Sequence, residues 1–381
     1  MIDAKIYNRA GELIGTRLHL DDGRITKITD EADNPTKVLL PGFVDVHCHG
    51  GGGKSFPDDP DLDSIRTAAL THRKTGTTRL VASLVSMADP LPAIEALVEA
   101  CEAGLLSGIH MEGPYVSPHK AGAQNPAVIR EPDLDELASW LKAGKGWILT
   151  MTIAPETPGA DKAARLLLSH GARPSWGHTV ATTKQAREAI AAANKAAEEL
   201  GVPAPAQTAT HLFNAMPGLA HREPGPVREL MAAGKRGECA VEIIGDGVHI
   251  DLDLVSDVLG ILDDPEYPAG MLITDAMAGA GMPDGDYQLG ALAVTIAHGT
   301  ATLTGTDTIA GGTSTIADQV RLLAKRGADL PMIVRAACLA PLLALHLSAP
   351  DIAVGEELEA VLLDENYEVE TVWRGGEEVT D

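Results

Sequence analysis

The fold is decided by the stretch Val38-Leu-Leu-Pro-Gly-Phe-Val-Asp-Val-His-Cys-His49, which four glycines at 50–53 follow directly. Its apolar run predicts a buried strand. His47 and His49 lie one residue apart, so both imidazoles point to the same side of an extended segment, and Cys48 points to the opposite side for packing. The glycines let the backbone turn sharply and leave room for a substrate. We therefore expect a metal site at the C-terminal end of a strand.

Outward from this stretch, short apolar runs alternate with Ala- and Leu-rich helical patterns. The expected strands are residues 42–46, 78–84, 107–111, 148–153, 174–176, 206–210, 240–244 and 271–274. The expected helices are residues 62–75, 92–103, 161–170, 183–200, 252–262 and 316–326. This α/β alternation predicts a closed parallel (β/α)8 barrel of the TIM type. A doubly wound open sheet is the alternative, but no Gly-x-Gly-x-x-Gly turn follows the first strand.

Both ends of the chain differ from the rest, because they consist of short segments in which apolar and polar residues alternate. Asp22-Gly23 between two such segments is a hairpin signal. Residues 1–40 and 350–381 are therefore expected to form one small β-sandwich domain. Residues 41–349 would form the barrel, which is the catalytic domain.

Composition excludes several classes of protein. A formal net charge of −24 over 381 residues argues against binding to nucleic acid, which needs a basic surface. The sequence has no apolar stretch long enough for a membrane helix and no signal-peptide pattern, so we expect a cytoplasmic protein. Four scattered cysteines without a Cys-x-x-Cys pair argue against a zinc ribbon or a disulfide framework.

Polar side chains follow most of the expected strands. They are His47 and His49 after the first strand, Glu112 after the third, His178 after the fifth, His211 and Asn214 after the sixth, Asp246 and His249 after the seventh, and Asp275 after the eighth. Each alone could be a hydrogen-bonded loop residue or a helix cap. Together they lie at the end of the barrel where catalytic groups gather, and imidazole with carboxylate suits zinc or iron. Such a metal lowers the pKa of bound water to about 7. Asp275 is suited to move a proton, so we expect hydrolysis of a C–N or similar bond.

The same residues resemble the amidohydrolase superfamily and, within it, the family of N-acetylglucosamine-6-phosphate deacetylases. The resemblance covers essentially the whole chain. Its most specific motifs begin at Pro41, His110, Gly177, His211, Asp246 and Thr274. Many superfamily members carry a carboxylated lysine, whereas this family has a glutamate at the third strand, matched here by Glu112.

The resemblance implies a metal site of one or two ions. Glu112, His178 and His211 match the ligands of the principal ion. His47 and His49, with Glu112 bridging and Asp275 nearby, match the ligands of a second ion. Zn²⁺ is the expected metal, with Fe²⁺, Mn²⁺ or Co²⁺ as alternatives. Asp275 matches the catalytic acid and base.

The resemblance also implies the substrate contacts and a homodimer. The matching positions are Ala123, Gln124, Asn214, Ala215, Arg222, His249, Ile309, Ala310 and Gly311. Arg222 matches a phosphate-binding arginine that acts across the dimer interface, and the alternative is that it is an ordinary surface arginine. Gln124 departs from the family, which has a histidine there. Glutamine can donate a hydrogen bond but cannot carry charge, and His119 is a further candidate for the lost role.

The expected reaction is removal of the acetyl group from N-acetylglucosamine 6-phosphate, giving glucosamine 6-phosphate and acetate, in amino-sugar catabolism and cell-wall recycling. The partner is thus a small phosphorylated amino sugar. One alternative is a deacetylase for another N-acetylated amino-sugar phosphate. The other is a non-catalytic barrel scaffold.

Overall fold

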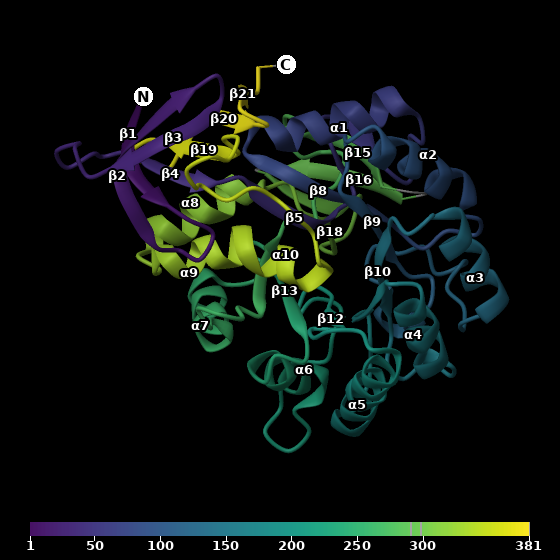
Figure 1. Cartoon of the computed structure of the whole chain (residues 1–381). Coiled ribbons are helices and arrows are strands. Elements are labelled where there is room, and N and C mark those ends of the chain that lie inside the picture. The colour runs from purple at the N-terminus through teal and green to yellow at the C-terminus, as the bar shows by residue number, and fades with distance from the viewer. Residues whose placement is uncertain (290–291, 298, 381) are drawn as a thin grey trace.

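The computed structural model describes residues 1–289, 292–297 and 299–380, and its central element is a barrel of parallel strands (Figure 1). Adjacent strands of its eight-stranded sheet all pair in parallel. In chain order they are β5 (Phe43–Cys48), β8 (Thr77–Leu84), β9 (Gly108–Glu112), β10 (Ile148–Ile153), β11 (Arg173–Trp176), β12 (Thr208–Ala209), β13 (Ala240–Ile244) and β14 (Gly270–Ile273). The predicted barrel is confirmed, with strand ends shifted by at most two residues.

A helix follows each barrel strand and covers the outside of the sheet. These helices are α1 (Leu62–Lys74), α2 (Leu91–Glu102), α3 (Leu134–Ala143), α4 (Ala160–Ser169), α5 (Thr183–Leu200), α6 (Gly225–Lys235), α7 (Leu252–Leu262) and α8 (Ile316–Arg326). Sequence patterns predict all of them except α3 and α6. Helix α3 begins at an Asp133 cap, and α6 begins at Gly225-Pro226 and carries Gly234 near its end, which weakens its helical pattern.

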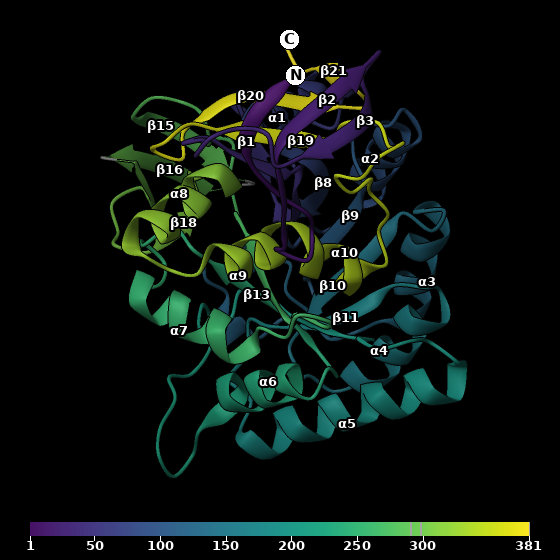
Figure 2. The same cartoon turned by 60° about the vertical axis from the view of Figure 1, so that its left-hand side comes forward.

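The barrel closes where its first and last strands meet. The backbone N–H of Asp275 donates to the carbonyl of His47 at 2.9 Å, and the N–H of His49 donates to the carbonyl of Ala276 at 2.7 Å. The opposite, N-terminal end of the barrel is filled by apolar side chains from the strands and from α10 (Ala340–Leu345). Figure 2 shows α9 (Leu330–Val334) and α10 running below the terminal strands, joined by a short π-helical segment, Arg335–Leu339. The polar end is therefore the C-terminal one.

Strands from both chain ends lie side by side in one seven-stranded sheet (Figure 1). Its members, in spatial order, are β21 (Glu377–Glu378), β20 (Val369–Arg374), β19 (Ala360–Leu363), β4 (Val38–Pro41), β1 (Ile2–Tyr7), β2 (Leu13–Asp21) and β3 (Arg24–Thr29). The sheet curls back on itself, because the N–H of Ile25 donates to the carbonyl of Glu356 and that of Leu358 to Gly23. This sheet-rich terminal region was expected; its boundaries at residues 40 and 350 stay a prediction.

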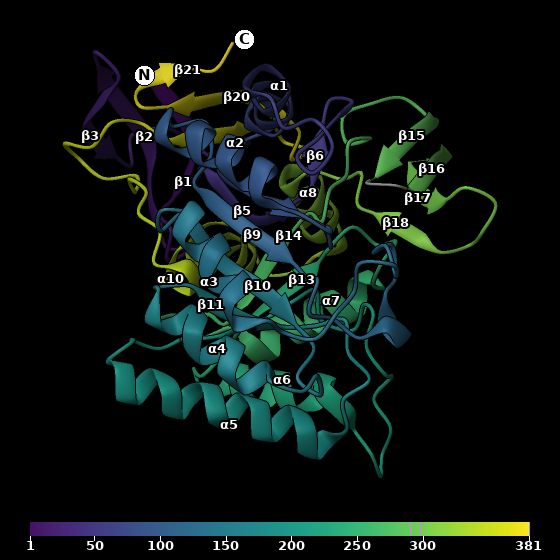
Figure 3. The same cartoon turned by 90° about the vertical axis from the view of Figure 1, so that its right-hand side faces the viewer.

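A four-stranded antiparallel sheet is inserted between β14 and α8. It consists of β15 (Gly285–Leu289), β16 (Leu292–Ala297), β17 (Thr300–Leu303) and β18 (Ile309–Gly311), and it stands out from the body in Figure 3. A small hairpin, β6 (Gly50–Gly51) and β7 (Lys54–Ser55), and a 3-10 turn at Pro118–Lys120 lie in other loops. Among the described residues, no helix combines the length and apolar content needed to cross a membrane.

Candidate metal centre

The predicted ligands converge at the C-terminal mouth of the barrel. β5 carries His47, and His49 follows directly after its last residue, while Glu112 is the last residue of β9. The other three follow the ends of their strands: His178 comes after β11, His211 after β12 and Asp275 after β14. All three have a positive φ, of 45°, 25° and 48°, in the left-handed region that side chains other than glycine rarely adopt. Such backbone conformations gather at functional sites.

The first group of ligands consists of Glu112, His178 and His211. Oε1 of Glu112 lies 2.8 Å from Nε2 of His178 and 2.9 Å from Nε2 of His211. The two Nε2 atoms are 3.1 Å apart. All three side chains are buried. This is the set that the family resemblance assigns to the principal ion.

The second group consists of His47, His49 and Asp275. Oδ1 of Asp275 lies 3.3 Å from Nε2 of His47 and 3.2 Å from Nε2 of His49. The other carboxylate oxygen of Glu112, Oε2, is 3.1 Å from Nε2 of His49. Glu112 therefore offers one oxygen to each group and lies between them.

The Nδ1 atoms of two of these imidazoles make hydrogen bonds that leave their Nε2 atoms directed at the site. Nδ1 of His49 lies 3.2 Å from the Ser83 carbonyl and Nδ1 of His178 lies 2.8 Å from the Lys120 carbonyl. A carbonyl only accepts, so each Nδ1 carries a proton, and when the ring is neutral its Nε2 has the free lone pair that a metal binds. Two Nε2 atoms that face each other at about 3 Å fit a metal ion shared between them. The donor set fits a divalent metal.

The electrostatics of the site also favour a cation. Burial by itself lowers the pKa of His47 and of His49, because it disfavours the charged ring. The carboxylates around them, Asp275 foremost, outweigh burial and raise the pKa of His47 to about 10 and that of His49 to about 9. Burial raises the pKa of Asp275, but the neighbouring His47 and His49 outweigh burial. The pKa of Asp275 therefore lies below its ordinary value. The site thus holds an excess of negative charge that protons or metal ions can balance.

A cavity of about 410 Å³ opens above the two groups. Eight residues of the predicted substrate set line it: Ala123, Gln124, Asn214, Ala215, His249, Ile309, Ala310 and Gly311. The last three form β18, so the inserted sheet supplies one wall. Arg222 is exposed on the loop before α6 and is not among the lining residues of the described chain. Their roles toward a substrate stay predictions.

Gln124 is held between two partners. Its Oε1 accepts from the backbone N–H of Ser86 at 2.6 Å, and its Nε2 donates to Oε2 of Glu112 at 2.6 Å. The amide donor that the sequence offered for an oxyanion is therefore directed at the carboxylate between the two groups.

Sequence reasoning missed several residues at or behind the site. Lys120, Asp307 and Thr308 line the cavity, and Glu242 lies behind His47. Lys120 lies in a loop, where spacing carries no signal. Glu242 did carry a signal in the sequence, because it is an acidic residue inside an expected buried strand. Charged side chains are almost never fully buried unless they are paired.

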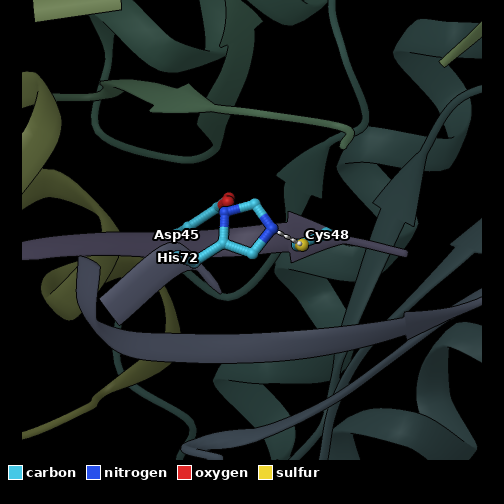
Figure 4. Close-up of side chains that lie close together, drawn as sticks. All are labelled: Asp45, Cys48 and His72. Atoms are coloured by element: carbon cyan, nitrogen blue, oxygen red, sulfur yellow. Dashed lines mark hydrogen bonds between the residues drawn. The ribbon is translucent and has the colours of Figure 1, made fainter. Parts of the chain in front are cut away.

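A third cluster consists of Asp45 and Cys48 of β5 with His72 of α1 (Figure 4). Sγ of Cys48 is 3.3 Å from Nε2 of His72, and that ring nitrogen also lies 2.8 Å from the carbonyl of Gly50. Asp45 accepts a hydrogen bond from the hydroxyl of Thr274 at 2.6 Å. These atoms already have hydrogen-bond partners and are sealed from solvent. The packing role expected for Cys48 is what the structure has.

Comparisons with known proteins agree with this geometry. The model of the amidohydrolase family matches residues 38–264, more than half of the chain. The N-acetylglucosamine-6-phosphate deacetylase of Vibrio furnissii is 30% identical over 90% of this chain and 83% of its own length. The N-acetylgalactosamine-6-phosphate deacetylase of Escherichia coli O157:H7 is 29% identical over 98% of this chain and 97% of its own.

A solved structure is also similar over nearly the whole chain. It is an aspartate-to-alanine mutant of N-acetyl-D-glucosamine-6-phosphate deacetylase from Mycobacterium smegmatis, in complex with N-acetyl-D-glucosamine-6-phosphate. It superimposes with a TM-score of 0.88 at 37% identity and covers 99% of this chain and 97% of that one. With the family model, the relatives and the ligand geometry in agreement, the chain belongs to the amidohydrolase family.

Proposed function

We propose that this protein is a metal-dependent hydrolase that removes the acetyl group from N-acetylglucosamine 6-phosphate. The observation that carries the proposal is the placement of Glu112. Its two oxygens reach His178 and His211 on one side and His49 on the other, at the floor of a cavity of about 410 Å³. The relatives and the solved structure named above act on, or bind, substrates of this class.

Glu112, His178 and His211 would hold the principal ion, and His47, His49 and Asp275 a second one. When bound there, a divalent metal supplies Lewis acidity and makes a water nucleophilic near neutral pH. Zn²⁺ is our expectation, because the donors are imidazole and carboxylate, which suit zinc.

Asp275 performs the proton transfers. Its side chain is 15% exposed and lines the cavity, while the backbone bond to His47 fixes its position. It takes a proton from the attacking water and delivers it to the departing amine, so that amide and water become amine and acetate. The left-handed φ of 48° at Asp275 turns the chain away from the direction of β14 at the mouth of the barrel.

The substrate contacts come from the loops around the cavity. Nδ1 of His249 lies 2.7 Å from Oδ2 of Asp246, which fixes the ring that we assign to the sugar. Gln124 donates to Glu112, so we assign the hydrogen bond to the acetyl oxygen to His249 and not to Gln124. Arg222 lies away from the cavity of its own chain, and we assign it to the phosphate bound in a partner subunit of a homodimer.

Two further parts of the proposal are the compartment and the assembly. All four cysteines are free and buried, which suits the reducing cytoplasm. A homodimer explains how an exposed Arg222 can serve a phosphate, because a bidentate guanidinium suits that group.

The second candidate substrate is N-acetylgalactosamine 6-phosphate, since one of the relatives is a deacetylase of that sugar. Acetate release from both phosphorylated sugars and from unphosphorylated N-acetylglucosamine decides between them. We expect the highest kcat/KM with N-acetylglucosamine 6-phosphate. Preference for the galacto sugar would select the second candidate, and no release from any sugar with metal present would refute both.

A further inference from the structure

Glu242 is a buried acidic side chain in the interior of the barrel. It lies in the middle of β13, between Ala240 and Ile244, whose side chains belong to the apolar cluster that fills the barrel. Only 1% of it is exposed. A carboxylate in such surroundings is costly unless its oxygens accept hydrogen bonds. Its partners therefore matter.

Those partners are one histidine from each metal group. Oε2 of Glu242 lies 2.9 Å from Nδ1 of His47 and accepts from the backbone N–H of His211 at 3.1 Å. The main-chain carbonyl of Glu242 accepts from the N–H of Leu212 at 2.9 Å. Glu242 is not among the residues that line the cavity in the described chain, so it can act on a substrate only through its neighbours.

The contact with His47 fixes which ring nitrogen faces the site. An ionised carboxylate only accepts, so Nδ1 of His47 carries a proton, and in the neutral ring the lone pair for a metal is on Nε2. That Nε2 lies 3.1 Å from Nε2 of His49 and 3.3 Å from Oδ1 of Asp275. A carboxylate behind a ligating imidazole also makes the ring a stronger base toward a metal. Carbonyls take this place behind His49 and His178, whereas His47 has the charged partner.

The contact with His211 supports a strained turn. The φ of His211 is 25°, a conformation that costs on the order of 1–3 kcal/mol for a residue of its kind. Nδ1 of His211 has no hydrogen-bond partner within the described part of the chain. Apart from the contacts of its Nε2 within the first group, the ring is oriented through its backbone, and two of the hydrogen bonds that hold this backbone, from residues 211 and 212, end on Glu242.

We propose that Glu242 is a positioning residue that ties the two metal groups together, and that the group of His47, His49 and Asp275 binds its ion tightly only with Glu242 in place. This inference rests on the proposed metal-dependent function. It adds a buried carboxylate, from a barrel strand that gives no ligand to either group, to the residues on which the metal centre depends.

The test is metal binding, measured without substrate. The metal-free protein is titrated with Zn²⁺ against a chromophoric chelator, and the visible spectrum of the Co²⁺-loaded protein is recorded. We compare the unaltered protein with Glu242→Ala, Glu242→Gln and Cys48→Ala. Cys48→Ala is the matched control, because Cys48 is equally buried and lies between the two histidines in the sequence, but its sulfur contacts His72 of α1.

We expect the unaltered protein to bind two ions. Glu242→Ala should weaken the second ion by about 10- to 100-fold and alter the Co²⁺ spectrum, as His47 loses its orientation. Glu242→Gln should fall between, because its amide oxygen still accepts from Nδ1 but lacks the charge. Cys48→Ala should leave both readouts unchanged.

Two ions bound with unaltered affinity in both Glu242 variants would overturn the inference, as would a single ion per chain in the unaltered protein. If Glu242→Ala does not fold, as judged by its thermal transition, Glu242→Gln alone decides by the same criterion. An unaltered protein that binds two ions yet releases no acetate would instead refute the proposed function and leave this inference standing.

Discussion

Gln124 donates a hydrogen bond from Nε2 to Oε2 of Glu112 at 2.6 Å, and Glu112 is the carboxylate that both candidate metal groups share. The residue that departs from the family pattern therefore serves a ligand. Its other end accepts from the N–H of Ser86, so the amide is fixed in one orientation. What the substitution changes is the support of Glu112.

Replacing Gln124 by Leu should lower kcat/KM for the phosphorylated sugar by about 10- to 100-fold, since a hydrogen bond to a charged group contributes about 1.5–3 kcal/mol. Gln124→Glu should lower it further, because a second carboxylate beside Glu112 repels it in a buried site. Steady-state acetate release measures both. Equal activity of Gln124→Leu and the unaltered enzyme would show that Glu112 needs no such support.

Asp275→Asn should abolish turnover while substrate binding survives. The amide is nearly the same size but cannot accept a proton, so a loss of at least about 10²- to 10⁴-fold in kcat is expected. Calorimetric titration with the phosphorylated sugar gives the binding constant, and acetate release gives the rate. Near-full activity of this variant would contradict the assignment of Asp275 as acid and base.

Arg222→Ala should raise KM chiefly for the phosphorylated sugar, because the guanidinium is assigned to the phosphate. Arg228→Ala is the control, since Arg228 is also an exposed arginine close to Arg222 in the sequence, and it pairs with Glu229 at 2.9 Å. KM is compared for the phosphorylated and unphosphorylated sugars. Equal effects on both sugars would remove the phosphate from the role of Arg222.

Removal of metal by a chelator should abolish activity, and Zn²⁺ should restore it. His49→Ala should reduce the metal content from two ions to one, because Nε2 of His49 contacts Asp275 and Glu112 at 3.2 and 3.1 Å. The ion at Glu112, His178 and His211 should stay. Elemental analysis after dialysis measures the content, and loss of both ions would show that the groups are not separable.

Asp246 should contribute to stability in a pH-dependent way. Burial raises its pKa, but the hydrogen bond with His249 outweighs burial, and the net pKa lies below the ordinary value. A depressed pKa adds stability above the unfolded-state value of about 3.9, and that stability is lost as pH falls through the folded-state pKa. The Tm of the unaltered protein should exceed that of Asp246→Asn at pH 6, and the difference should shrink below about pH 4. A difference that does not change with pH would contradict this.

Much of the barrel was predictable, because its strands and long helices have strong local patterns. The bounds of β10, β13, α5, α7 and α8 follow the sequence expectation residue for residue. The inserted sheet was not predicted, since its strands are short and half-exposed and resemble loop. Strand β12 has only two residues, and the chain has left the sheet before it reaches His211.

The ligands were predictable for a different reason. Parallel strands bring their C-terminal ends to one edge, so His47, Glu112 and Asp275 had to meet there. The partners behind them could not be derived in this way. The contact of Glu242 with His47 joins residues 195 positions apart, and no local pattern records which buried acid will meet which histidine.

The hydrogen bond from the Asp275 N–H to the His47 carbonyl also joins the last barrel strand to the first, which closes the sheet into a ring. Asp275, which we propose as the acid and base, is thus placed beside His47 only when the last strand docks on the first. Glu112, His178 and His211 lie at the ends of strands that precede β14 in the chain, whereas Asp275 follows β14 itself. A chain in which β14 has not docked therefore contains every ligand assigned to the principal ion but does not hold Asp275 beside His47.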